Sequence, residues 1–431
     1  MSEWVPEQRS DFRKVVLQNL NASAFISLLA PMATELSKTF SVNVADIGFI
    51  NAVFLFTSGF ISLLWALLAD KTRRKRLLLI CASIWSICSF LSFIAFNFYI
   101  LLILQVIAAI GFGGVLPISF TLIVDLTVPE KRSYALGILQ LCITLGAGLG
   151  LLLGGLLVDV LPWWSLFLIV SILGFINIMT LLSINEPKRG SLDELFSQDQ
   201  SLSEDFSFKI QAEDLKEVFR IKSNDLLVLY TLLKSLTVGA INFYFISMME
   251  VDHDIETSVA TILMVIIFSS QIAGAPILGK ITDEQYKKRK TGKADILVIL
   301  LITGPLFYIL GFSLIFTSSD MLLIVLFVTL ILIAAFLLAA DAAISQSIIS
   351  DVNPPQIRST VFSIQYIATT IGQSLGVLIL GSLYGLFGNQ FREGFVILGF
   401  LLMSSVLFLL PLRKMVVSDI DHLELKYRET K

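Results

Sequence analysis

Cysteine and histidine are scarce in this chain of 431 residues, which has three cysteines and two histidines. Cys81, Cys88 and Cys142 lie inside long apolar runs, where cysteine usually serves as a small packing residue, so we expect neither a disulfide nor a metal site. His253 and His422 lie outside those runs, which excludes a histidine proton relay within a membrane. The chain also lacks a Gly-x-x-x-x-Gly-Lys-Ser/Thr phosphate-binding loop, so we expect no ATP-driven motor in it and no cofactor.

Charge is scarce as well: 15% of the residues are charged, 56% are hydrophobic and the mean hydropathy is +0.84. Twelve apolar runs each reach the length of about 20 residues that a helix needs to cross a bilayer. Only helices and closed barrels satisfy their backbone hydrogen bonds in lipid, and these runs lack the strict alternation of barrel strands. The sequence therefore predicts an all-α membrane protein with twelve transmembrane helices. The predicted spans are 14–36, 45–69, 77–96, 99–125, 134–158, 162–185, 226–249, 256–281, 294–316, 320–350, 359–386 and 391–412.

The basic residues gather in loops that fall on one side of the membrane if the helices alternate in direction. These loops include DKTRRKR at 70–76 and KKRKTGK at 287–293, whereas the opposite side has the acidic stretch MMEVDHDIE at 248–256. Basic loops stay in the cytoplasm, so we expect both termini inside and His253 outside. The first apolar run is long and is followed by others, which predicts a retained helix and not a cleaved signal peptide. We expect an integral, multi-pass protein of a prokaryotic-type plasma membrane.

The two halves of the chain resemble each other. DLTVPEKRS at 125–133 matches DVNPPQIRS at 351–359, a shift of 226 positions that also relates Gly146, Gly150 and Gly155 to later glycines. Asp70 and Asp283 correspond at a smaller shift of 213, which predicts a longer loop after the eighth span. Two similar halves of six helices around a midplane site are a transporter architecture.

This repeat predicts two pseudo-symmetric six-helix bundles with a polar connection between them. The polar, acidic start of that connection is typical of a flexible tether, and apolar residues at helical spacing in 210–224 favour a short amphipathic surface helix. The predicted divisions are 1–185 for the N-terminal bundle, 186–225 for the cytoplasmic linker, 226–412 for the C-terminal bundle and 413–431 for a cytoplasmic tail.

The loop after the second span carries a charged motif. It reads Ala66-Leu-Leu-Ala-Asp70-Lys71-Thr72-Arg73-Arg74-Lys75, and with it the chain resembles the major facilitator superfamily over nearly its whole length. Asp70, Lys71, Arg74 and Lys75 match the family signature, whereas Ala66 and Arg73 replace its glycines. A carboxylate at the membrane boundary can cap a helix and arginines can bridge to nearby acids, which predicts a cytoplasmic gate. The alternative is that these basic residues only set the topology. The gate candidates are Asp70, Lys71, Arg74, Asp125, Glu130, Arg132, Asp283, Asp351 and Arg358.

The fifth span contains regularly spaced glycines. They resemble a motif of exporters in the superfamily, although Leu151 stands where that motif has proline. Such spacing lets helices approach closely, and ordinary helix packing is the alternative to an exporter signature. The glycines are Gly137, Gly146, Gly150, Gly154 and Gly155.

Within the superfamily, the chain is most similar to the spinster-like lipid transporters, on the stretch IGFGGVLPISFTLIVDLTVPEKRSYALGI at 110–138 and on EPKRG at 186–190. That resemblance implies sphingolipid-type or lysophospholipid substrates. However, Phe25 and Ile26 stand where the family has an Asp-Arg pair, and Gly114 stands where it has a glutamate. The family's coupling chemistry therefore does not carry over to the first half.

Two ionisable residues lie deep in predicted spans, where charges are costly and usually functional. Lys234 and Asp341 lie at similar depth, roughly 12 to 15 Å from the cytoplasmic surface, and the repeat relates them to Asn21 and Val115. A Lys–Asp pair could take up a proton or bind a zwitterionic head group, and a purely structural salt bridge is the alternative. Further polar candidates for the cavity are Asn21, Asn242, Gln140, Gln346, Gln365 and Tyr366.

These features favour a secondary active transporter that moves a small amphipathic or lysolipid-like solute by alternating access, coupled to protons. A uniporter or importer of a polar solute such as a sugar or organic acid remains open, as does a non-transporting sensor on the same fold. No paired catalytic carboxylates or nucleophile–base arrangement supports an enzyme. We expect a monomer in the lipid bilayer that binds a small molecule or lipid and protons, without nucleic acid.

Overall fold

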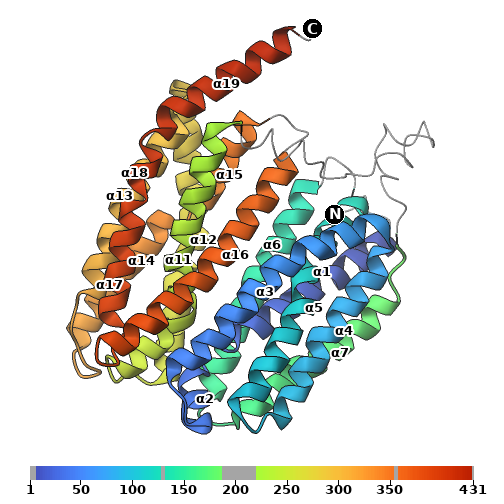
Figure 1. Ribbon diagram of the computed structural model, residues 1–431, viewed down its shortest axis with the longest axis vertical. Helices are drawn as coiled ribbons and strands as arrows, with labels where there is room; N and C mark the ends of the chain where they lie inside the picture. The colour runs from blue at the N-terminus through green and yellow to red at the C-terminus, as the bar shows by residue number, and fades with distance from the viewer. Residues whose placement is uncertain (1–5, 128–131, 187–219, 354–357, 430–431) are drawn as a thin grey trace. The chain divides into compact units, whose positions relative to one another are not determined.

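The computed structural model describes residues 6–127, 132–186, 220–353 and 358–429 (Figure 1). Within these ranges every regular element is a helix, which confirms the all-α class. Contacts divide the chain into two compact units, Met1–Lys209 and Ile210–Lys431. Of the predicted amphipathic helix at 210–224, residues 210–219 lie outside the described residues and residues 222–224 belong to α11. We treat each unit by itself.

Unit 1 consists of helices that run back and forth and pack on their neighbours, with α4 and α3 both packed on α5 and with α1 packed along α6. Its helices are α1 Pro6–Ser27, α2 Ala33–Phe40, α3 Val44–Lys71, α4 Arg74–Leu91, the short 3-10 helix η1 Ser92–Ile94, α5 Phe98–Asp125, α6 Arg132–Leu157 and α7 Trp163–Leu182.

Unit 2 repeats this arrangement, with α11 packed along α16 as α1 is along α6. Its helices are α11 Lys222–Val251, α12 Thr257–Lys288, α13 Gly292–Phe312, α14 Met321–Leu338, α15 Asp341–Val352, α16 Arg358–Leu386, α17 Arg392–Ser404, α18 Val406–Leu409 and α19 Leu412–Glu429.

Eleven spans in the described residues are long and apolar enough to cross a membrane, and they correspond to the second to twelfth predicted spans. The first predicted span is divided instead between α1 and α2 by a turn at residues 28–32. Pro31 lies in this turn, and proline disfavours a helix interior because it lacks an N–H donor and its ring clashes with the preceding turn. The tenth span is divided too, because α14 ends at Leu338 and α15 starts at Asp341.

Two segments that we expected to be irregular are helical. The residues that lengthen the connection after the eighth span extend α12 to Lys288, so they form helix and not loop. The predicted tail forms α19, which Figure 1 shows in red at the C-terminal end of unit 2. Leu412, Val416 and Ile420 of α19 are buried in the core of unit 2, and Asp419 accepts a hydrogen bond from the Ser223 hydroxyl (2.6 Å).

Glycines allow α6 and α16 to approach α1 and α11 closely. A Cβ built on Gly146 would meet the carbonyl oxygen of Leu20, and one built on Gly150 would meet that of Ala24. In unit 2, a Cβ on Gly372 would meet the carbonyl oxygen of Leu232, and one on Gly376 would meet that of Leu236. Backbone-to-backbone packing is thus repeated in both units, as small residues permit.

The other glycines of the fifth predicted span differ. A Cβ on Gly154 would meet the ring of Pro31, and Gly155 is buried. Gly137 is exposed, and no described atom lies within 4 Å of a Cβ built there. The predicted packing role therefore does not extend to Gly137.

Substituting alanine at Gly150 should destabilise the protein by about 1–3 kcal/mol, because the added methyl group overlaps the Ala24 backbone. Gly148→Ala is the matched control on the same helix, since a Cβ there meets no described atom within 4 Å. Because alanine favours helix over glycine, the control should be neutral or slightly stabilising. Thermal unfolding of the purified variants tests this, and equal midpoints for the two would contradict the close approach.

Candidate functional site

The two deep charges of unit 2 are in contact. The Lys234 ammonium on α11 lies 2.8 Å from Asp341 Oδ2 on α15 and donates a hydrogen bond to Oδ1 (3.0 Å). The Tyr230 hydroxyl, one turn before Lys234, donates to Asp341 Oδ2 (2.8 Å). The Asp341 side chain is 5% exposed, whereas that of Lys234 is 20% exposed. The carboxylate is therefore enclosed by its partners, and the Lys234 side chain is the more exposed member of the pair.

The break between α14 and α15 places Asp341 at a helix start. Asp341 is the first residue of α15, and Ala340 before it provides no side-chain cap. The first backbone N–H groups of a helix have no partner within the helix and favour negative charge nearby. The Asp341 carboxyl group therefore lies beside a helix start and two side-chain donors.

Uncharged polar side chains hold α11, α15 and α16 together around this pair. The Gln365 amide donates to the Thr231 hydroxyl (3.1 Å) and to the Ser345 hydroxyl (2.9 Å). Closer to the basic end of unit 2, Asn224 and Asn353 exchange amide hydrogen bonds of 2.8 and 2.7 Å. α15 is therefore fastened to α11 at its beginning and at its end.

Unit 1 has a related polar contact without charges. The Asn19 amide on α1 donates to the Ser119 hydroxyl on α5 (2.8 Å). Ser119 and Ser345 correspond at the shift of 226. The corresponding glycines of the two units contact Leu20 and Leu232, and Ala24 and Leu236, so the first helices of the two units are related by a shift of 212 positions. At this shift Asn19 corresponds to Thr231.

This contact-based shift corrects the predicted counterpart of Lys234, which is Ala22 and not Asn21. At the same shift Tyr230 corresponds to Gln18, and Val115 remains the counterpart of Asp341. Gln18 is 0% exposed, and both polar atoms of its amide lack a hydrogen-bond partner among the described residues. Unit 1 therefore carries an uncharged residue at each position of the ionic cluster.

The remaining polar candidates do not join the cluster. Gln140, Asn242 and Gln346 are exposed, Tyr366 is half-buried, and none of them has a recorded hydrogen bond from its side chain to Lys234 or Asp341 within the described ranges. Asn21 is buried, and its amide nitrogen finds no partner in the part of the chain that the structure describes. Among the described candidates, Lys234 and Asp341 contact each other, and Gln365 bonds to neighbouring residues of the same two helices.

The charged residues at the basic end of unit 1 form a buried network. Arg74, at the start of α4, is 4% exposed and pairs with Asp125 at the end of α5. Its guanidinium also donates to the Thr121 carbonyl oxygen (3.3 Å), and its backbone N–H donates to Glu186 Oε1 (2.8 Å). Charge-assisted bonds of this kind fasten the ends of α4 and α5 to the segment after α7.

Unit 2 has an equivalent contact. Lys293, in the first turn of α13, is buried, pairs with Asp351 near the end of α15 and lies 4.1 Å from the ring centre of Tyr286. Asp283 is exposed and has no recorded ion pair among the described residues. The side chains of Asp70, Lys71, Arg132 and Arg358, and all of Glu130, lie outside what the structure describes.

Three residues of these sites escaped sequence reasoning. Tyr230 precedes Lys234 by four positions, so helical spacing alone puts both on one face of α11. Lys293 ends the basic run KKRKTGK, and only its burial separates it from the exposed cations before it. Glu186 belongs to the stretch EPKRG that carried the family resemblance, but its contact with Arg74 spans 112 positions.

Residues 15–336 match the family model described as the Major Facilitator Superfamily. The chain is 31% identical over 170 residues to the sphingosine-1-phosphate transporter SPNS2 of Danio rerio, covering 38% of this chain and 34% of that protein. It is 24% identical over 383 residues to protein spinster homolog 1 of Xenopus tropicalis, covering 85% and 70% of the two chains.

Among solved structures, a bacterial homologue of the human lysosomal transporter Spinster superposes with a TM-score of 0.75 at 18% identity, covering 96% of this chain and 98% of that one. Several curated relatives match over only about a third of their length, 36% and 34% in two cases. At this identity the solved structure establishes a shared fold.

Replacing Lys234 by methionine should destabilise the protein by about 3–5 kcal/mol, because Asp341 then remains buried without its countercharge. The double variant Lys234→Met with Asp341→Leu should recover most of this loss. Thermal unfolding of the single and double variants measures the difference. A double variant no more stable than Lys234→Met alone would contradict a pairwise role.

Proposed function

The chain belongs to the Major Facilitator Superfamily, and from that premise we propose that it is a proton-coupled secondary transporter of a small amphipathic or lysolipid-like solute, working by alternating access. The observation that carries the proposal is the enclosed cluster of Lys234, Asp341 and Tyr230. Its two charged members lie on α11 and α15, within segments long and apolar enough to span the membrane. Ionisable groups in such segments mark substrate or proton paths.

The unequal exposure of the pair suggests how it works. Lys234 is the accessible partner, so the anionic group of a substrate can approach its ammonium while Asp341 stays enclosed. As Lys234 turns toward a substrate anion, Asp341 loses its countercharge and takes up a proton. Counted together with the substrate anion, the cluster keeps its net charge of zero, which avoids an unpaired charge in a low-dielectric environment.

The substrate class rests on two supports. One is the similarity to a relative named as a sphingosine-1-phosphate transporter and to spinster homologues. The other is the composition, with 33 phenylalanines and few charges, which suits a solute with an apolar tail better than a sugar. We propose that the charged networks Arg74–Asp125–Glu186 and Lys293–Asp351 stabilise one state of the cytoplasmic gate.

One observation favours a second candidate, an uncoupled uniporter. Asp341 has three favourable partners, namely an ammonium, a phenol and a helix start, and so many partners suit a permanent structural salt bridge. In that case Lys234 and Asp341 only fix the packing of α11 on α15, and transport does not depend on the pH gradient.

Asp341→Asn separates the two candidates. The amide cannot release a proton, yet it resembles the protonated carboxyl, so the variant should lose pH-gradient-driven transport and keep passive exchange of the substrate. Uptake of a fluorescent lysophospholipid into proteoliposomes, with and without a pH gradient, measures both. Asp159→Asn, which removes an exposed carboxylate in the turn between α6 and α7, is the control and should behave as wild type. Gradient-driven transport that survives in a stable Asp341→Asn protein would leave the uniporter.

We also propose that the protein is a monomer with both termini in the cytoplasm. His253 is 3% exposed, so a cysteine in its place would react poorly. Glu256 and Lys288 are exposed and lie at opposite ends of α12. In a background without Cys142, Glu256→Cys should react with an impermeant maleimide on intact cells, and Lys288→Cys should react only after permeabilisation. The reverse pattern would invert the topology.

A further inference from the structure

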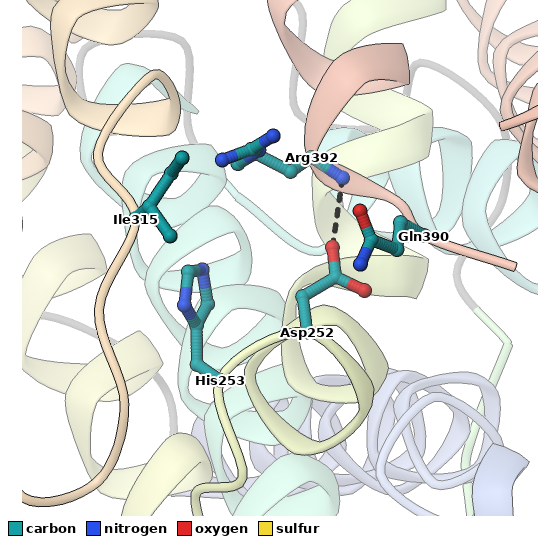
Figure 2. Close-up of a pocket in the computed structure, with 5 residues that line it drawn as sticks. All are labelled: Asp252, His253, Ile315, Gln390 and Arg392. Atoms are coloured by element: carbon teal, nitrogen blue, oxygen red, sulfur yellow. Dashed lines mark hydrogen bonds between the residues drawn. The ribbon is translucent and has the colours of Figure 1, made fainter. Parts of the chain in front are cut away.

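Asp252 connects the end of α11 to the start of α17. Its Oδ2 atom accepts hydrogen bonds from the backbone N–H groups of Phe391 (2.9 Å) and Arg392 (2.8 Å), where α17 begins. Figure 2 shows the carboxylate directed at the Arg392 backbone nitrogen, with Gln390 beside it. The site is a pocket of about 50 Å³ lined by Asp252, His253, Ile315, Gln390 and Arg392.

The neighbouring charges do not neutralise Asp252. The Arg392 guanidinium pairs with Glu393, and Figure 2 shows it turned away from the carboxylate toward Ile315. The other titratable groups that face Asp252 are Glu393 itself, Tyr384 on α16 and His253 in the same loop. Asp252 is thus a carboxylate held by backbone N–H groups and without a cation of its own.

One oxygen of this carboxylate is unused. Asp252 Oδ1 is buried and has no hydrogen-bond partner among the described residues, and the same is true of Glu393 Oε2. A buried anionic oxygen without a donor is unfavourable, and a bound proton removes its charge. Burial raises the pKa of Asp252 to about 6, outweighing the two backbone hydrogen bonds, which lower it.

We propose that Asp252 is a proton-binding site at the end of unit 2 opposite its basic loop, and that proton uptake there strengthens the packing of α17 on α11. This site needs neither Lys234 nor Asp341, so it stands whether or not that pair couples transport to protons. In unit 1, by contrast, the start of α7 is held by the aromatic contact of Phe40 with Trp163, whose ring centres lie 5.5 Å apart. Only the junction in unit 2 is made by a titratable group, within the described residues.

The direction of the effect follows from linkage. In an opened junction Asp252 is in water and titrates near its ordinary pKa of 3.8, whereas the packed junction holds it at about 6. The packed state therefore binds the proton more tightly, and its stability falls as the pH rises from about 4 through about 6. Acidification from about pH 7.5 to about pH 5 should favour the packed junction roughly tenfold.

His253 acts in the opposite direction. Its ring stacks on Phe316 and its Nδ1 atom lies 2.8 Å from the Phe316 carbonyl oxygen, and burial lowers its pKa. A group with a lowered pKa of this kind disfavours the packed state as the pH falls below its ordinary value of 6.5. A comparison of two proteins that both contain His253 cancels this opposing contribution.

Asp252→Asn provides that comparison, because asparagine keeps an oxygen for the two backbone N–H groups and cannot carry a charge. At about pH 7.5 the variant should unfold at a higher temperature than wild type. At about pH 5 the difference between the two unfolding temperatures should be smaller. The ratio of the variant's unfolding constant to that of wild type should change roughly tenfold between these two pH values. Asp254→Asn is the control, because Asp254 is exposed and its φ of 54° is a conformation that asparagine tolerates. The difference in unfolding temperature between this variant and wild type should not depend on pH.

Amide hydrogen exchange of the peptide 389–398 localises the effect when variant and wild type are compared at the same pH. We expect faster exchange in wild type at about pH 7.5, equal exchange at about pH 5, and no difference in peptides from unit 1. The proposal would be overturned by a variant that is less stable than wild type at about pH 7.5 or that fails to fold, because the packed junction would then favour the ionised Asp252 carboxylate. A difference in stability that does not change with pH would also overturn it, because Asp252 would then bind the proton equally tightly in the packed and opened junctions.

Discussion

A carboxylate inside a membrane-spanning helix must find its partners within the protein, since lipid offers none. Asp341 meets this constraint with three elements at once: the start of its own helix and two side chains of α11. The arrangement requires a break after α14, because an uninterrupted helix has no unpaired N–H groups at that depth. It also requires α11 to stay in place, which the Gln365 bridge and the Asn224–Asn353 pair ensure. Much of the polar structure of unit 2 follows from this one buried charge.

The two units show how one framework accommodates different chemistry. Both use glycines to bring one helix onto the backbone of another, and both place a serine at the same crossing. Unit 2 has a phenol and two charges at the bonded positions Tyr230, Lys234 and Asp341, whereas unit 1 has Gln18, Ala22 and Val115 there. The buried, unbonded amide of Gln18 is the polar residue that unit 1 retains in this place. At these three positions, charge is therefore found in unit 2 and not in unit 1.

Composition and hydropathy were enough to predict the helical class and most of the spans, because length and apolarity in a bilayer leave few alternatives. The differences between the predicted and the observed helices have local causes. Pro31 lies in the turn that ends α1 early. The polar residues of α19 and of the end of α12, from which we predicted a tail and a loop, are helical. Counting residues from the cytoplasmic ends of the predicted spans was enough to place Lys234 and Asp341 at a similar depth. It could not supply Tyr230, Lys293 or Glu186, whose roles depend on contacts between distant segments. The one-residue error at Asn21 arose because loop lengths differ between the halves.

The position of α19 bears on biosynthesis. The beginning of α11 enters the bilayer long before α19 is translated, yet Ser223 bonds to Asp419 and Leu227 shares a core with Leu412 and Val416. During insertion this end of α11 is consequently held by neither contact, and unit 2 reaches its final packing only after residue 420 has emerged from the ribosome.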